Sequence, residues 1–268
     1  ISPKNISKIS EGEKINKISL KRIIAVFLNQ GSNKAFASQD IRRALNLATD
    51  KKGLVEKILM SYGTVIDGPL PRPADENIYD PDEARAILSK QKKEVAFTLT
   101  TVKTPELLDI AETLKNMWTS VGFKVELKTF PVGNLEQSVI GPRRYDAFLY
   151  GEEVIGENPD PFAFWHSSQR THPGYNIALY ANSRVDKALE EVRATKDTEK
   201  KAKLYDDIHR EIRRDLPAIF LFSPYFMYAT PPDLKGIDIK SVNTGSDRFS
   251  EIHKWYFKKD YIWKIFLN

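Results

Sequence analysis

The sequence predicts an α/β fold, because strand-like and helix-like segments alternate along the chain. Apolar or alternating runs at residues 18–29, 95–101, 123–129 and 218–222 are typical of strands. Between them lie segments with apolar residues at helical spacing, and the clearest of these begins after Thr104 and Pro105. Such an order favours helices packed on a sheet over an all-β or all-α domain. A chain of 268 residues is long enough for one large or two small domains with a well-buried core.

The first third of the chain opens with a polar segment and continues with a strand and two helices. Residues 1–17 are rich in Ser, Lys and Asn and are expected to form a loop or a mobile end. Residues 18–29 first alternate and then become continuously apolar, as a strand does on entering a buried sheet. Ser38 and Asp50 are candidate N-caps of two helices, over residues 39–48 and 51–59. Residues 63–73, with their prolines and glycines, then interrupt the helical pattern.

The middle of the chain carries the strongest helix signals. Asp80 is a candidate N-cap, Pro81 suits the first helical position, and Glu83 completes a capping box. Residues 95–101 are expected to form a strand, and the next helix ends at Gly122 before an alternating strand at 123–129. The apolar face expected for that helix is formed by Leu107, Ile110, Ala111, Leu114 and Trp118.

The last third begins after a strand at residues 145–150 and an acidic loop. Residues 183–193 and 199–214 are expected to form two helices, and residues 218–222 a buried strand. The tail over residues 237–268 is aromatic but has no regular helical face. Its large aromatic residues are Phe249, Trp255, Tyr256, Phe257, Tyr261, Trp263 and Phe266.

The charge distribution argues against a nucleic-acid partner. The net charge is +5, but residues 1–22 contribute +4 and residues 251–268 contribute +2, so the body between them is close to neutral. The chain has no cysteine, which excludes disulfides and thiolate chemistry. No apolar run approaches the roughly 20 residues of a membrane span. The chain starts at Ile1 without a Met or an apolar leader, so we expect it to begin in the middle of a longer protein.

Motifs for metal, nucleotide and hydrolase chemistry are missing from the sequence. The histidines at 166, 172, 209 and 253 lack metal-ligand spacing, and no GxSxG, Walker or GxGxxG pattern occurs. We therefore expect no metal and no cofactor. One enzymatic alternative remains, because Glu152, Glu153, Glu157 and Asp160 could supply the carboxylate pair of a glycosidase.

Residues 151–169 form the most informative stretch of the chain. Their sequence, GEEVIGENPDPFAFWHSSQ, follows the strand that contains Tyr150 and combines acids, prolines and aromatic residues. Prolines at 159 and 161 prevent a helix or a central strand, so the stretch is expected to be a loop at a strand end, where binding groups are common. Acids beside Phe164 and Trp165 suggest a wall for a cationic or amide-rich ligand. The alternative is an ordinary Asp-Pro turn whose aromatic residues belong to the core.

Several segments together resemble the family 5 extracellular solute-binding proteins, the oligopeptide, dipeptide and nickel receptors of ABC importers. Residues 41–51 (IRRALNLATDK) are similar to the family's (V/I)RxAlxxAxD(R/K) segment, and residues 79–88 (YDPDEARAIL) to its YdPekAkxLL segment. Residues 54–73, with GPLP near their end, resemble the loop between the two. The segments 145–151 (YDAFLYG), 158–161 (NPDP), 185–189 (VDKAL) and 215–220 (DLPAIF) follow in the family's order.

The resemblance implies a fold and a function. It implies a type II periplasmic-binding-protein lobe, a mixed sheet flanked by helices, that lacks most of the other lobe. Residues 1–29 would form a hinge or entry segment, 30–235 the C-terminal ligand-binding lobe, and 236–268 a tail returning toward the hinge and first lobe. The function implied is capture of oligopeptides for an ABC permease on the outer side of the cytoplasmic membrane, by a lipid-anchored or periplasmic protein, without catalysis. A carboxylate-dependent hydrolase and a peptide-binding chaperone or sensor module are the alternatives.

The resemblance also implies a binding site. Peptide-binding members hold the ligand's α-amino group with an acid in the loop before the Pro-Asp-Pro turn, and Glu157 occupies that position here. Where members often read GWGADY, this chain has GEEVIG at residues 151–156, which leaves the ligand's identity open. The residues expected to contact the ligand are Glu157, Asp160, Trp165, Phe164 and Tyr150.

Overall fold

The fold is built on one mixed sheet with helices on both faces. A computed structural model describes residues 3–9, 11–76, 78–153 and 160–257. The sheet has eight strands in the order β5-β4-β6-β2-β7-β1-β9, and β3 pairs with β7 outside this path. The strands are β1 (Lys14–Leu20), β2 (Arg22–Leu28), β3 (Gly63–Val65), β4 (Ala96–Val102), β5 (Lys124–Phe130), β6 (Ala147–Glu153), β7 (Ala218–Thr230) and β9 (Ser241–Val242).

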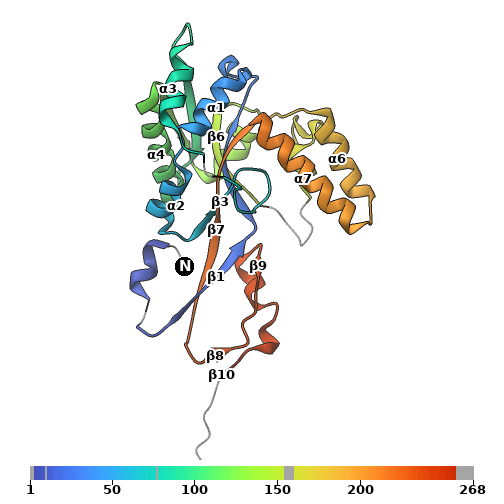
Figure 1. Cartoon of the computed structure of the whole chain (residues 1–268). Coiled ribbons are helices and arrows are strands. Elements are labelled where there is room, and N and C mark those ends of the chain that lie inside the picture. The colour runs from blue at the N-terminus through green and yellow to red at the C-terminus, as the bar shows by residue number, and fades with distance from the viewer. Residues whose placement is uncertain (1–2, 10, 77, 154–159, 258–268) are drawn as a thin grey trace, which may run out of the picture.

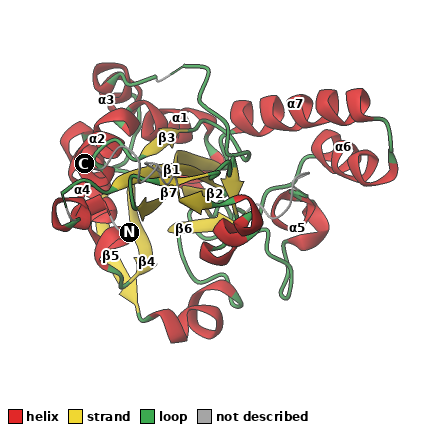
Figure 2. Ribbon diagram, turned by 90° about the horizontal axis from the view of Figure 1, so that it is seen from below, coloured by secondary structure: helices red, strands yellow, loops and turns green. Residues whose placement is uncertain are grey.

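The helices form two groups on opposite faces of this sheet (Figure 1; Figure 2 shows the same arrangement from below). One group is α1 (Gln39–Leu47), α2 (Lys51–Leu59), α3 (Pro81–Ser89) and α4 (Pro105–Val121). The other is α5 (Phe162–Trp165), α6 (Ser183–Ala194) and α7 (Thr198–Asp215). Among the described residues, no helix has the length and apolar character that a bilayer crossing needs.

Strand β2 shows why the sequence at residues 22–28 is apolar without alternation. Ile24 and Val26 face the core under α1–α4, whereas Ala25 and Phe27 face the core under α5–α7. Because both faces of β2 are covered by helices, neither set of alternate residues points to solvent, and the strand is apolar throughout. Strands β6 and β7 pair with β2 on either side, both antiparallel, whereas β4 pairs with β5 and β6 in parallel.

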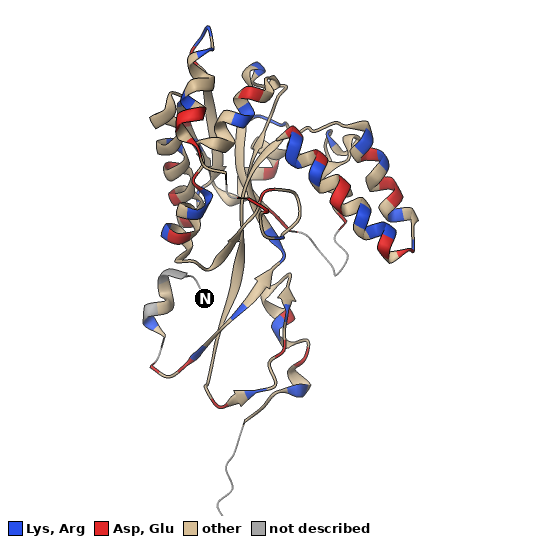
Figure 3. Ribbon diagram, viewed as in Figure 1, with Lys and Arg blue, Asp and Glu red and all other residues tan. Residues whose placement is uncertain are grey.

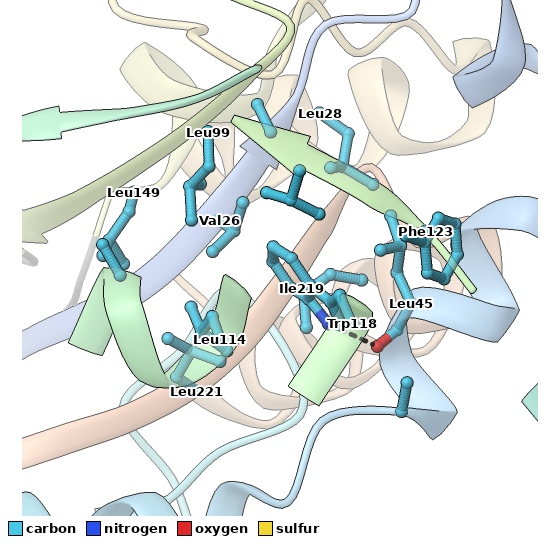
Figure 4. Packing of buried hydrophobic residues seen from close by; sticks show 14 of the residues in the cluster. Val26, Leu28, Leu45, Leu99, Leu114, Trp118, Phe123, Leu149, Ile219 and Leu221 are labelled. Atoms are coloured by element: carbon cyan, nitrogen blue, oxygen red, sulfur yellow. Dashed lines mark hydrogen bonds between the residues drawn. The ribbon is translucent and has the colours of Figure 1, made fainter. Parts of the chain in front are cut away.

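Trp118 lies at the centre of the core under α1–α4 (Figure 4). Its ring is fully buried, and its Nε1–H donates to the carbonyl of Leu45 at 3.2 Å and to Oγ1 of Thr49 at 3.0 Å. A buried indole needs such a partner, because an unpaired N–H in an apolar core loses its hydrogen bond to water. This contact fixes α4 to the end of α1.

Local signals read from the sequence are confirmed at several helix ends. The Asp50 side chain accepts from the N–H of Gly53, and the Asp80 side chain from the N–H of Glu83, both at 2.8 Å. Gly122 ends α4 with a φ of 115°, a left-handed conformation that favours glycine. Ser38 stands at the N-cap of α1 but makes no side-chain cap hydrogen bond.

Three expectations about strands were wrong. The loop expected over residues 1–17 contains the start of β1 at Lys14, and the strand expected over 18–29 is two strands that meet at Lys21. Strand β7 runs for 13 residues, well beyond 218–222. The cause is shared, because β1 pairs antiparallel with the second half of β7, from Lys14 opposite Thr230 to Ser19 opposite Tyr225. Both segments are partly exposed there and lack the apolar pattern of a central strand.

The described part of the aromatic tail gathers around this extension of β7. Trp255 lies 6.0 Å from Tyr228 and 5.9 Å from Phe249, ring centre to ring centre. The tail also forms a small second sheet, in which β8 (Leu234–Lys235) pairs with β10 (Tyr256–Phe257). Both residues of β10 are more than half exposed, so part of the tail presents aromatic rings to solvent.

Candidate ligand-binding site

An open cleft of about 820 Å³ lies where β6 ends and β2 begins, beside the middle of β7. It is bordered by α2, by the start of α4 and by the short π-helical turn at Glu136–Ile140. Its aromatic lining consists of Tyr62, Tyr150, Phe164, Tyr175, Tyr225 and Phe226. Its charged lining consists of Arg22, Glu106, Glu136, Glu152 and Glu153. Carboxylates thus outnumber cations in a cleft with largely aromatic walls.

Arg22 and Glu153 form an ion pair across the start of β2 and the end of β6. The two residues are register partners on these antiparallel strands, and a guanidinium nitrogen contacts a carboxylate oxygen. Both side chains are about two-fifths exposed, so the pair contributes little to stability. Its main effect is local, because Arg22 is the cation closest to the acids at the end of β6 and is already paired with Glu153.

Glu152 is the unusual acid of the cleft. Its exposed fraction is 3%, and its Oε1 has no hydrogen-bond partner among the described residues. Its register partner on β2 is Ile23, which offers no polar group. Burial raises the pKa of this carboxyl well above its usual value, since the charged form loses water without gaining a partner.

Glu152 should make the folded chain less stable as the pH rises. The folded pKa lies above the unfolded one, so this side chain's contribution is fully present below about pH 4.5 and is lost as the pH rises toward the folded value. We expect Glu152→Gln to raise the free energy of unfolding near neutral pH by about 1–3 kcal/mol. Urea unfolding of both forms across a pH series measures the difference, which should vanish at acidic pH. A difference independent of pH would contradict the buried, proton-sensitive carboxyl.

The structure brings two of the five expected site residues into the cleft. Tyr150 lies near the end of β6 with its ring stacked 5.1 Å from that of Phe148, and Phe164 on α5 lies 6.3 Å from Tyr175. Both rings line the cleft. Glu157 lies outside the described residues, so its place stays a prediction.

Asp160 and Trp165 lie elsewhere. Asp160 accepts from the N–H of Phe162 at 3.1 Å and from Nη2 of Arg193 at 2.6 Å, and it does not line the cleft. Trp165 is 1% exposed and packs in the core against Phe220, with ring centres 5.6 Å apart. Trp165 could contact a ligand directly only if this core opened. In the structure as it stands, its indole holds α5 against the sheet.

Sequence reasoning missed the part of the cleft that comes from other strands. Arg22 at the start of β2 and the residues Pro224, Tyr225, Phe226 and Met227 of β7 all line it. The only signal in the sequence was the run of aromatic residues that continues past residue 222. Recognising it as cleft lining requires the pairing of β7 with β1, which connects residues more than 200 positions apart.

Among the described residues, no group of three or more His, Cys, Asp or Glu side chains is arranged to hold an ion. His209 instead bonds Asp67 at 3.1 Å, and His166 stacks on Phe162 with ring centres 4.1 Å apart. Positively and negatively charged residues are interspersed along α6 and α7 (Figure 3).

Comparison with known proteins identifies the family. The family model described as "Bacterial extracellular solute-binding proteins, family 5 Middle" matches residues 1–176. The chain belongs to this family. Among curated relatives of this family 5 chain, oligopeptide-binding protein AppA of Bacillus subtilis is 26% identical over 252 residues, covering 85% of the chain and 45% of AppA. Glutathione-binding protein GsiB of Pectobacterium atrosepticum is 25% identical over 249 residues, covering 85% of the chain and 48% of GsiB.

Solved structures agree with the type II periplasmic-binding-protein fold of this family 5 chain. AppA of Bacillus subtilis in complex with a nonapeptide superposes with a TM-score of 0.78 at 22% identity, covering 97% of the chain and 55% of AppA. NikZ of Campylobacter jejuni in complex with Ni(L-His) gives a TM-score of 0.77 at 25% identity, covering 95% of the chain and 56% of NikZ. The chain spans about half the length of the curated relatives that it matches.

Proposed function

We propose that this chain is the C-terminal lobe of a receptor that captures oligopeptides for an ABC importer. The observation that carries the proposal is the open cleft, in which aromatic walls and several carboxylates line about 820 Å³ beside the sheet. Aromatic surfaces suit peptide side chains of many kinds, and carboxylates suit the ammonium and amide N–H groups of a peptide. Relatives named for oligopeptide and glutathione binding support the same reading.

The proposed ligand site lies between two lobes. Each matched relative is about twice as long as the region it shares with this chain, so another lobe has room to close over the cleft. In this arrangement residues 1–29 are the hinge and entry segment, 30–235 the lobe, and 236–268 the tail that returns to the first lobe. Strand β2 ties the entry segment firmly to the lobe, because it lies between β6 and β7. The protein would act outside the cytoplasmic membrane, as a periplasmic or lipid-anchored receptor, and deliver its ligand to a permease.

The test is direct binding of peptides to the full-length protein, with Glu157 as the probe of orientation. Calorimetry with a panel from dipeptides to nonapeptides should detect binding without cleavage. We expect Glu157→Gln to weaken binding of a peptide with a free amino terminus by about 10- to 100-fold, because an ammonium loses its charged partner in a closed site. Mass spectrometry of the recovered peptides checks for hydrolysis in the same samples.

N-acetylated versions of the same peptides are the control. They carry no terminal ammonium, so the substitution should leave their binding nearly unchanged. Equal losses for both forms would mean that Glu157 acts only through the shape of its loop. Absence of binding for the whole panel would exclude peptide capture, and cleavage products would favour the carboxylate-dependent hydrolase instead.

A further inference from the structure

Glu152 differs from the other charged residues of the cleft. It lines the cleft, yet 97% of its surface is buried and its Oε1 has no partner among the described residues. The other acids of the cleft are more accessible: Glu106 and Glu136 are exposed, and Glu153 has its own cation in Arg22.

Among the described residues, the cations nearest to Glu152 have other partners. Arg22, on the neighbouring strand, is engaged with Glu153, and Arg143, which lies beside Tyr145, donates to the carbonyls of Ile140, Arg170 and Gly174. The other nearby ionisable groups are Tyr145, just before β6, Tyr150 on β6, and Glu136 of the π-helical turn. The Tyr145 hydroxyl is already used, since it donates to the carbonyl of Ile177 at 2.5 Å. These groups are neutral or acidic, so none of them compensates a negative charge on Glu152.

The fold does not require a carboxyl at this position. The side chain lies on the same face of β6 as Phe148 and Tyr150, and its register partner on that face of β2 is the apolar Ile23. An apolar side chain would pack there without the cost of burying an unpaired polar oxygen. A buried carboxyl at the wall of a cleft becomes favourable only when something in the cleft pairs with it.

We propose that Glu152 anchors a cationic side chain of the ligand, the ammonium of a lysine or the guanidinium of an arginine. The inference deepens the proposed function, because it assigns the cleft a preference among peptides. A cation at this position would be shielded from water, where a charge-assisted hydrogen bond is stronger than at a surface. It is a separate role from that proposed for Glu157, which concerns the α-amino group.

The pairing also couples ligand capture to a proton. Because burial raises the pKa of Glu152, the empty site holds a proton more readily than an exposed glutamate does. A cation bound beside the carboxyl favours its ionised form, so binding should release a proton to the buffer. A neutral ligand should release none.

The first experiment compares two peptides with the full-length protein. Ala-Lys-Ala carries the cation, and Ala-norleucine-Ala has a side chain of nearly equal length without it. We expect Glu152→Gln to weaken binding of the lysine peptide by about 10- to 100-fold and to change the affinity for the norleucine peptide less than about twofold. Calorimetry in two buffers of different ionisation enthalpy should show proton release only with the lysine peptide and only for proteins that retain Glu152. The matched control is Glu126→Gln, the same change at an exposed position on β5, away from the cleft.

The second experiment does not depend on peptide binding. Butylammonium chloride should raise the melting temperature of wild type and of Glu126→Gln, but not of Glu152→Gln, relative to equal concentrations of butanol and of sodium chloride. If peptides bind and Glu152→Gln affects both tripeptides equally, with no selective effect of butylammonium, the anchor is excluded and peptide capture stands. If no peptide binds but the butylammonium effect depends on Glu152, the anchor stands and peptide capture fails. If no peptide binds and butylammonium has no effect that depends on Glu152, the anchor and peptide capture are both overturned.

Discussion

Replacing Trp165 by alanine is expected to destabilise the chain by about 3–5 kcal/mol, the usual cost of deleting a fully buried aromatic side chain. The indole is 1% exposed and lies between Phe27 at 6.2 Å, Phe220 at 5.6 Å and Tyr180 at 6.2 Å, measured between ring centres. Its loss leaves a cavity between α5 and the sheet that these rings cannot fill. Urea unfolding followed by circular dichroism measures the change in the free energy of unfolding.

The matched variant is Phe164→Ala, one residue earlier on the same short helix. Phe164 is only partly buried and lines the cleft, so its removal should cost less stability and act mainly on ligand binding. Trp165→Phe, which keeps an aromatic ring in the core, should recover part of the stability and leave binding unchanged. A strong loss of binding by a stable Trp165→Phe protein would show that the indole contacts the ligand.

Replacing Lys51 by methionine should stabilise the chain near neutral pH by up to about 3 kcal/mol. Lys51 is 5% exposed, and burial lowers its pKa from 10.5 to about 8, although the attraction of Asp67 acts in the opposite direction. Below pH 8 the ammonium is charged in both states, so folding must bury a charge. A shift of this size corresponds to about 3 kcal/mol, which methionine, with a side chain of similar length, does not incur.

The pH dependence distinguishes this explanation from a simple gain in packing. The unfolded chain binds more protons than the folded chain between pH 8 and 10.5, so the Lys51 contribution to stability should rise across that window. The difference between wild type and Lys51→Met should therefore shrink as the pH increases. Lys52→Met is the control, because the neighbouring side chain is 70% exposed and should show neither effect. A difference that stays constant with pH would contradict the buried ammonium.

Asp67 should tolerate the loss of Lys51. Burial alone would raise the pKa of this carboxyl, but the hydrogen bond from His209 and the charge of Arg213 lower it overall. Nε2 of His209 lies 3.1 Å from Oδ1, and Nε of Arg213 lies 3.0 Å from Oδ2. These two partners remain in Lys51→Met, so the substitution does not leave an isolated buried anion.

The sequence by itself determined most helices and the central strands, because their signals are local. Asp50, Asp80 and Gly122 mark helix ends through hydrogen bonds or backbone conformations that involve only near neighbours. The helices expected over 183–193 and 199–214 agree with α6 and α7 to within one residue at each end. Apolar runs on β2 and β7 were recognisable since both faces of these strands are covered.

Only the tertiary structure decided which side chains line the cleft. Lys14 pairs with Thr230, and this long-range pairing carries Tyr225 and Phe226 to the cleft from a segment without a strong strand pattern. Packing of α5 on β2 and β7 buries Trp165 against Phe27 and Phe220 and leaves Phe164, its neighbour, lining the cleft. In the sequence Glu152 is one acid among several, and only the fold distinguishes it, by burying it beside the apolar Ile23 of β2. Burial depends on which distant segments pack together, and a residue's type and local spacing do not specify that.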